Sequence, residues 1–167
     1  VLSVIVMGCY ALGGRGWEYG WGPQDDQDSI DSYQRALELG INWIDTAPAY
    51  GLGHAEDVLA RALSSAPRRP IVATKCGLSW DEGGNILKVF DRATVQQEAE
   101  GSLRRLGVDV IDLYQVHWPP VPDDTLEEGW SAMSRLVADG KVRYLGVSNG
   151  NEYVDPALRT PTAYNST

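Results

Sequence analysis

Short apolar runs alternate along the chain with longer segments of helical periodicity. The apolar runs predict five strands, which span residues 4–8, 41–44, 71–75, 110–116 and 142–147. Between them, apolar residues recur every three or four positions and predict helices over residues 28–39, 54–63, 94–106 and 125–139. This alternation of strand and helix is typical of an α/β fold with a parallel sheet and right-handed crossovers.

Several local signals mark where these elements begin and end. Gly40 and Gly140 follow the last apolar position of their helices, where glycine commonly ends a helix. Thr125 and Glu128 have the spacing of a capping box, in which each side chain accepts a hydrogen bond from the other residue's backbone N–H. The polar, glycine-rich segment 76–85 predicts a loop after the third strand.

Polar residues stand at the carboxyl ends of four predicted strands. Asp45, Lys75, His117 and Ser148–Asn149 occupy these ends, and Tyr50 follows in the loop after the second strand. Ligands of α/β folds bind at this edge, and in a barrel the strand ends converge on one mouth. A tyrosine hydroxyl can donate a proton, and a nearby ammonium lowers its pKa. The pattern therefore predicts a proton-transfer site, with Asp45 as the ionic partner of Lys75.

Each of these residues also has a plain structural explanation. Asp45 can cap the following turn, Lys75 can reach solvent, and Tyr50 can be a half-buried loop aromatic. His117 can be a strand-end histidine whose hydrogen bonds are satisfied within the fold. The joint placement on one rim favours the functional interpretation, because chance explains one such position more easily than four. The second histidine, His54, lies among glycines and is expected to be solvated or to cap a helix rather than to act in catalysis.

Four motifs in order resemble the aldo-keto reductase family. They are Asp45–Gly51 (Asp-Thr-Ala-Pro-Ala-Tyr-Gly), Thr74–Lys75, Gln115–Trp118 and Gly146–Asn149, and the resemblance extends from about residue 4 to residue 149. It implies a TIM (β/α)8 barrel, of which this chain would supply about five of the eight parallel strands. We expect a partial barrel over residues 1–149 and an irregular tail over residues 150–167, in a fragment or truncated form of a longer protein.

The resemblance implies reduction of aldehyde or ketone carbonyls to alcohols with a reduced nicotinamide. The family's catalytic tetrad falls on Asp45, Tyr50, Lys75 and His117, with Tyr50 as the general acid and His117 orienting the carbonyl. NADP(H) is the expected cofactor and NAD(H) the alternative. The substrate would be a small carbonyl compound.

The family's cofactor contacts carry over to six positions, which are Gly8, Cys9, Tyr10, Asp45, Ser148 and Asn149. Cys9 and Tyr10 depart from the threonine and tryptophan that the family has there. Family residues that hold the pyrophosphate and adenosine come after the fifth strand and cannot be assigned in this chain. A non-enzymatic regulatory subunit, or an inactive remnant, is therefore the alternative to a reductase.

Composition limits the number of domains, the kinds of partner and the chemistry of the cysteines. A length of 167 residues, with 43% hydrophobic and 22% charged residues, predicts one globular domain, and a net charge of -9 disfavours nucleic acid and anionic membranes as partners. Cys9 and Cys76 are expected to be reduced thiols in a cytoplasmic protein, and the few histidines and cysteines lack the spacing of a metal site. The first and fifth strands would be open sheet edges, which predicts self-association.

The segment 16–26 is rich in glycine and aromatic residues, including Trp17, Tyr19 and Trp21. It can be a surface loop packed on the barrel or a wall of the substrate pocket, since loops at this edge often carry function. The sequence leaves both interpretations open.

Overall fold

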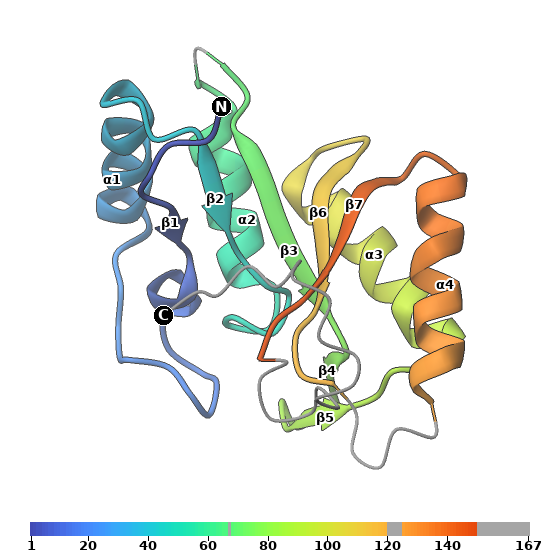
Figure 1. Ribbon diagram of the computed structural model, residues 1–167. Coiled ribbons are helices and arrows are strands. Elements are labelled where there is room, and N and C mark those ends of the chain that lie inside the picture. Colours follow the sequence, from blue (N-terminus) through green and yellow to red (C-terminus); the bar gives the residue numbers. More distant parts are fainter. Residues whose placement is uncertain (67, 120–124, 150–167) are drawn as a thin grey trace.

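In the computed structural model, a five-stranded parallel sheet has four helices packed against it (Figure 1). The structure describes residues 1–66, 68–119 and 125–149. The sheet order is β1-β2-β3-β6-β7, with β1 at Met7–Gly8, β2 at Trp43–Asp45, β3 at Ile71–Cys76, β6 at Ile111–Val116 and β7 at Val142–Val147. The helices are α1 at Asp26–Glu38, α2 at His54–Leu63, α3 at Arg92–Leu106 and α4 at Leu126–Ala138, with a short 3₁₀ helix, η1, at Tyr10–Gly13. The predicted α/β class and partial barrel are confirmed.

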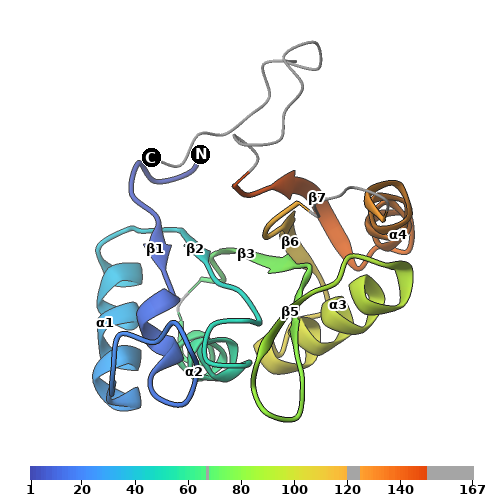
Figure 2. The ribbon, with the colours of Figure 1, turned by 90° about the horizontal axis from the view of Figure 1, so that it is seen from below.

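All four α-helices cover one face of the sheet, as Figure 2 shows. Two apolar clusters fill the space between helices and strands, one around Ile44, Leu59 and Val72 and the other around Tyr114 and Met133. The opposite, concave face is lined along one row of register partners by Gly8, Asp45, Ala73, Leu113 and Tyr144. No helix in the described part of the chain covers this inner face, on which Tyr144 is 71% exposed.

Side chains cap some of the helices, but one expected cap is wrong. The Asp25 carboxylate accepts hydrogen bonds from the backbone N–H groups of Gln27 and Asp28, which starts α1 at Asp26. Thr125 precedes α4 without any side-chain capping bond. Its backbone is helical, with φ -105° and ψ -1°, rather than extended as a capping residue usually is. Glu128 accepts instead from the backbone N–H of Arg92 at 3.4 Å.

The first strand is shorter than predicted. Only Met7 and Gly8 pair with β2, opposite Ile44 and Asp45, while Val4 is 101% exposed. β2 has only three residues, so it could not pair the whole of the predicted five-residue strand. The chain before Met7 is held by side chains instead, because the backbone N–H of Ser3 donates to the Asn42 Oδ1 at 2.8 Å.

The expected loop after β3 contains a β-hairpin. β4 at Leu78–Trp80 and β5 at Ile86–Lys88 pair antiparallel, with Leu78 opposite Lys88 and Trp80 opposite Ile86. The Asp81 carboxylate closes the turn by accepting from the backbone N–H groups of Gly83 and Asn85, each at 2.9 Å. The hairpin extends the carboxyl edge of the sheet and becomes a wall of the site described below.

β1 and β7 are the edges of the five-stranded sheet, as expected for the first and fifth strands. Self-association through them stays a prediction. The expected tail, residues 150–167, lies outside the described residues, so the division at residue 149 also stays a prediction. None of the helices in the described ranges has the length and apolar character needed to cross a membrane. Cys9 and Cys76 are both free and buried.

Candidate active site

Three neighbouring strands deliver polar side chains to one edge of the sheet. Asp45 ends β2, Lys75 is the penultimate residue of β3, and His117 directly follows β6. The ladder continues past the strand ends, because the His117 backbone N–H donates to the Cys76 carbonyl at 2.8 Å and that of Thr46 donates to the Ala73 carbonyl at 2.8 Å. These bonds fix the directions in which the site side chains leave the backbone.

The Lys75 ammonium is the centre of the site. It donates to the Asp45 Oδ2 at 2.6 Å, to the Thr46 carbonyl at 2.9 Å and to the Tyr50 hydroxyl oxygen at 3.3 Å. An ammonium has three N–H groups, so these three acceptors satisfy it fully. The Lys75 side chain is only 4% exposed, and burial of a charge at this depth requires such partners.

Tyr50 is held in a tight loop beside this ammonium. The loop can approach η1 closely because residue 51 is a glycine with φ 64°, and a Cβ there would collide with the backbone of Gly13. The phenol oxygen accepts from Lys75, which leaves its own proton to be donated elsewhere. Burial raises the pKa of Tyr50 by more than the Lys75 ammonium lowers it. The net shift is upward, whereas the sequence led us to expect a downward one.

His117 faces Tyr50 from the next strand. The two rings meet edge to face, with centroids 5.6 Å apart, and His117 is 8% exposed. Burial, helped by the nearby Lys75 charge, lowers the pKa of His117 to about 3, so the imidazole is neutral at physiological pH. The Asn149 amide nitrogen donates to the His117 carbonyl at 2.9 Å and ties the end of β7 to this residue.

Gln115 is a further site residue that the sequence reasoning missed. Its amide nitrogen donates to the Asp45 Oδ1 at 3.3 Å, the oxygen that Lys75 does not use. The available signal was strand alternation, because Gln115 lies two residues before His117 and so projects to the same face of the sheet. Asp45 is therefore held from two neighbouring strands.

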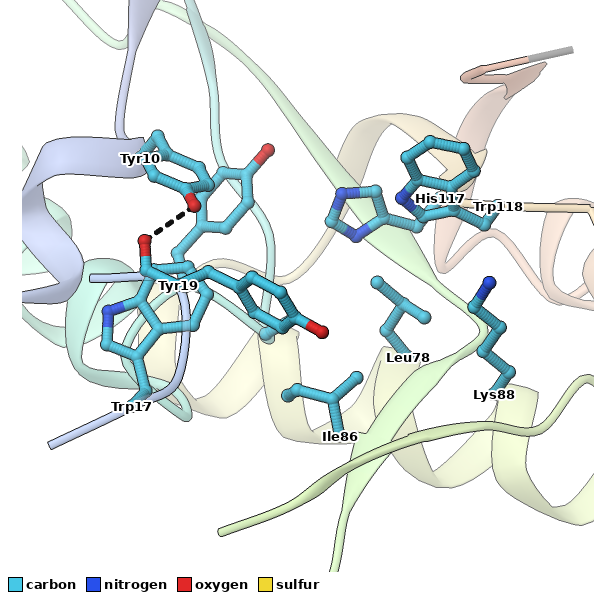
Figure 3. Close-up of a pocket in the computed structure, with 10 residues that line it drawn as sticks. Tyr10, Trp17, Tyr19, Leu78, Ile86, Lys88, His117 and Trp118 are labelled. Carbon is cyan, nitrogen blue, oxygen red and sulfur yellow. Dashed lines mark hydrogen bonds between the residues drawn. The ribbon is translucent and has the colours of Figure 1, made fainter. Parts of the chain in front are cut away.

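A cavity of about 310 Å³ opens in front of Tyr50 and His117 (Figure 3). Its wall is largely aromatic and aliphatic, and it is formed by Tyr10, Trp17, Tyr19, Ala49, Tyr50, Leu78, Ile86, Lys88, His117 and Trp118. Trp17 and Tyr19 line this cavity, as the pocket-wall interpretation of the segment 16–26 requires, and binding of a substrate there stays a prediction. Trp21 lies 5.2 Å from Tyr10 between ring centroids but is 81% exposed. The hairpin residues were not singled out from the sequence, and Trp118 was part of a family motif but was given no role.

The expected cofactor-contact residues occupy different settings. Gly8 pairs with Asp45 at the edge of the inner face, and a Cβ at Gly8 would meet no atom within 4 Å. Tyr10 lines the cavity. The Cys9 side chain is instead fully buried in the core, and burial raises the pKa of its thiol to about 12. Cys9 can therefore offer a ligand only backbone atoms without rearrangement.

The remaining expected contacts, Ser148 and Asn149, directly follow β7, where the Ser148 backbone N–H donates to the Val116 carbonyl at 2.8 Å. His54 is not part of the cavity wall; its Nε2 lies 2.9 Å from the Asp26 Oδ1 at the start of α1. The structure thus brings together Asp45, Tyr50, Lys75 and His117.

Comparisons with known proteins agree with this arrangement. The model of the aldo/keto reductase family matches residues 5–157. The chain is 42% identical over 149 residues to the aldo-keto reductase YhdN of Bacillus subtilis, covering 88% of this chain and 43% of that protein. It is 37% identical over 161 residues to the NADH-specific methylglyoxal reductase of Escherichia coli, covering 89% of this chain and 48% of that protein.

Among solved structures, the glycerol dehydrogenase AKR11B4 from Gluconobacter oxydans superposes with a TM-score of 0.78 at 43% identity. That match covers 89% of this chain and 45% of the other. The chain therefore spans less than half the length of these relatives.

Proposed function

The chain belongs to the aldo-keto reductase family, and we propose on that basis that its site reduces aldehyde or ketone carbonyls to alcohols with a reduced nicotinamide dinucleotide. One observation carries the proposal: beside an open cavity, the Lys75 ammonium donates both to the Asp45 carboxylate and to the Tyr50 hydroxyl oxygen. The chain spans less than half the length of these relatives, so we also propose, as a separate step, that this polypeptide is itself active.

Reduction of a carbonyl adds a hydride to carbon and a proton to oxygen. In this proposal, residues of this chain supply the proton. Tyr50 lines the cavity, and its hydroxyl accepts from Lys75 without giving up its own proton. Donation of that proton to the carbonyl oxygen, as negative charge builds there, leaves a phenolate 3.3 Å from the Lys75 ammonium. Tyr50 is thus the general acid in this proposal.

Lys75, Asp45 and His117 support that transfer in different ways. The Lys75 charge stabilises the phenolate form, which offsets part of the cost of ionising a buried tyrosine. Asp45 holds the ammonium in place at 2.6 Å. The neutral His117 imidazole can donate one N–H to the carbonyl oxygen and orient it without competing as an acid.

The carboxyl edge of the sheet, on its concave face, offers groups that can bind a nicotinamide. Ser148, Asn149 and Gln115 bring hydroxyl and amide groups to this edge, and such groups can hydrogen-bond a carboxamide. The open space beside Gly8 allows a ring to approach the strand ends. When bound, a reduced nicotinamide supplies the hydride. Both NADPH and NADH remain candidates, and the name of one relative specifies NADH for that protein.

Replacement of Tyr50 by phenylalanine tests the proposal. The variant keeps the ring but lacks the acidic proton, so we expect turnover of a small aldehyde such as methylglyoxal to fall by about 10²–10⁴-fold. Nicotinamide affinity, measured by fluorescence titration, should be retained. Tyr144→Phe is the matched control, because Tyr144 is 71% exposed on β7. Retained turnover in Tyr50→Phe would remove Tyr50 from the acid role, and failure of the unaltered chain to bind the nicotinamide would favour the non-enzymatic alternative.

A further inference from the structure

The cavity wall carries one formal charge at neutral pH. Of the described residues that line it, Lys88 is the only one with a permanent charge, because His117 has a pKa of about 3 and is neutral. Among the described residues, the wall includes neither aspartate nor glutamate. The Lys75 ammonium behind Tyr50 is paired with the Asp45 carboxylate at 2.6 Å, so it adds little net charge to the cavity. The cavity is therefore cationic, although the whole chain has a net charge of -9.

The hairpin register fixes Lys88 on the cavity side. Lys88 is the cross-strand partner of Leu78, and Ile86 lies two residues before it, so the three side chains share one face of the hairpin. All three line the cavity. The opposite face carries Leu87, which is 42% exposed. A lysine placed only for solubility would be expected on that outer face and not beside a pocket.

No carboxylate in the described part of the chain neutralises the charge of Lys88. Its ammonium lies 5.5 Å from the centroid of the Trp118 ring, a cation–π contact that steadies the charge without cancelling it. Lysines stand at positions 75, 88 and 141. In the described ranges, Lys75 pairs with Asp45 and Lys141 with Glu100, whereas Lys88 makes no ion pair with a carboxylate.

Figure 3 shows how this charge lies relative to the rest of the cavity. Lys88 and Trp118 are on one side, Tyr10 and Trp17 are on the other, and the aliphatic side chains of Leu78 and Ile86 lie between. A molecule that spans the cavity therefore meets proton donors near Tyr50, an apolar middle and the Lys88 ammonium, which has no carboxylate partner among the described residues. We propose that Lys88 selects carbonyl substrates that carry a carboxylate, separated from the reacting carbonyl by an apolar spacer.

This inference rests on the proposed reductase function, because that function places the substrate carbonyl near Tyr50. Recognition of the substrate carboxylate by Lys88 can be tested separately, by binding alone. Trp17 and Trp118 line the cavity, so their fluorescence can report occupancy. The probes are 3-phenylpropanoate and its uncharged methyl ester, with Lys88→Gln as the variant. Lys88→Arg keeps the charge, and Lys141→Gln is the matched control because Lys141 pairs with Glu100 away from the cavity.

We expect the unaltered protein to bind the carboxylate about fivefold more tightly than the ester, as one partly exposed ion pair allows. Lys88→Gln should lose this preference, while Lys88→Arg and Lys141→Gln keep it, and added salt should weaken it. An unchanged preference in Lys88→Gln, or an equal loss in Lys141→Gln, would overturn the inference.

Turnover separates a failure of this inference from a failure of the proposed function. The substrates are 5-oxopentanoate and its methyl ester, and the ratio of their KM values is compared across the same variants. We expect Lys88→Gln to raise the KM of the acid about fivefold relative to that of the ester. If both aldehydes are reduced and the ratio is unchanged, carboxylate selection is wrong and the reductase function stands. If neither is reduced but Lys88-dependent binding is seen, carboxylate recognition stands and the reductase function fails.

Discussion

Strand β3 carries a buried ionic cluster on each of its two faces. On the concave face, Lys75 joins Asp45 and Tyr50; we call this the inner cluster. On the helix face, Glu56 accepts from the Thr74 hydroxyl and from the Arg105 Nε, each at 2.7 Å; we call Thr74, Glu56 and Arg105 the outer cluster. Glu56 is completely buried, deeper than any member of the inner cluster.

The two clusters differ in what lies next to them. Tyr50, a member of the inner cluster, forms part of the cavity wall, whereas no member of the outer cluster lines that cavity. The outer cluster instead connects β3 to Glu56 on α2 and Arg105 on α3. Burial of charge is therefore common to both and does not by itself indicate catalysis. Access of a ligand to the buried groups is what distinguishes the inner cluster. Substitutions in the inner cluster should therefore lower turnover, and substitutions in the outer cluster should lower stability.

The largest expected effect is on turnover, from Lys75→Met in the inner cluster. The variant removes the charge that stabilises the Tyr50 phenolate, and we expect the kcat for aldehyde reduction to fall by about 10²–10⁴-fold. Steady-state kinetics measure this, and circular dichroism confirms that the variant is folded. A kcat within tenfold of the unaltered value would show that the inner cluster is structural, like the outer one.

The next effect is on stability, from Arg105→Met in the outer cluster. Glu56 would keep only its Thr74 partner in a fully buried position, and loss of one member of a buried ion pair costs about 3 kcal/mol. Urea unfolding measures the loss, with Arg104→Met as a control because Arg104 is exposed on the same helix. The kcat of the folded variant should be unchanged, and a large drop in kcat at full folding would contradict the distinction between the clusters.

The same contrast explains what the sequence could predict. Asp45, Lys75 and His117 were found because each directly follows or ends an apolar run, and parallel strand ends meet at one edge whatever the details of packing. The helices were found because their apolar period is a local property, and their observed bounds differ from the predicted ones by at most two residues. Strong local patterns thus predicted the alternation of strands and helices and the polar residues at the strand ends, whereas the partial barrel and the roles of the tetrad came from the family resemblance.

Features that depend on a distant partner were not predicted. β4 and β5 have three residues each, too few for a period to be recognised, although the Asp81–Asn85 turn between them is a recognisable signal. Thr125 does not cap its helix because its backbone is helical rather than extended, and the other half of the expected box, Glu128, accepts from Arg92 on another helix. The net pKa shift of Tyr50 depends on its depth of burial, which no spacing in the sequence specifies.

The smallest expected effect is on the pH dependence of stability, and it comes from Glu98, which lies beside the outer cluster on α3. Its Oε2 accepts from the backbone N–H of Gly77 at 2.7 Å, at the junction of β3 and the hairpin. Its Oε1 is buried without a hydrogen-bond partner in the described part of the chain. Burial raises the pKa of Glu98 from 4.5 to about 7, and the Gly77 bond and the Arg105 charge offset this only in part.

The raised pKa sets the sign of a pH effect on stability. Between pH 4.5 and about 7 the folded chain keeps a proton on Glu98 that the unfolded chain has lost, so this group lowers stability progressively as the pH rises through that range. Glu98→Gln mimics the protonated carboxyl and should remove this contribution. We expect the variant to gain roughly 1–3 kcal/mol relative to the unaltered chain on going from pH 5 to pH 8, measured by urea unfolding. Glu82→Gln, in the exposed hairpin turn, should show no such gain, and an equal pH profile for both variants would mean that Glu98 is ionised in the fold at neutral pH.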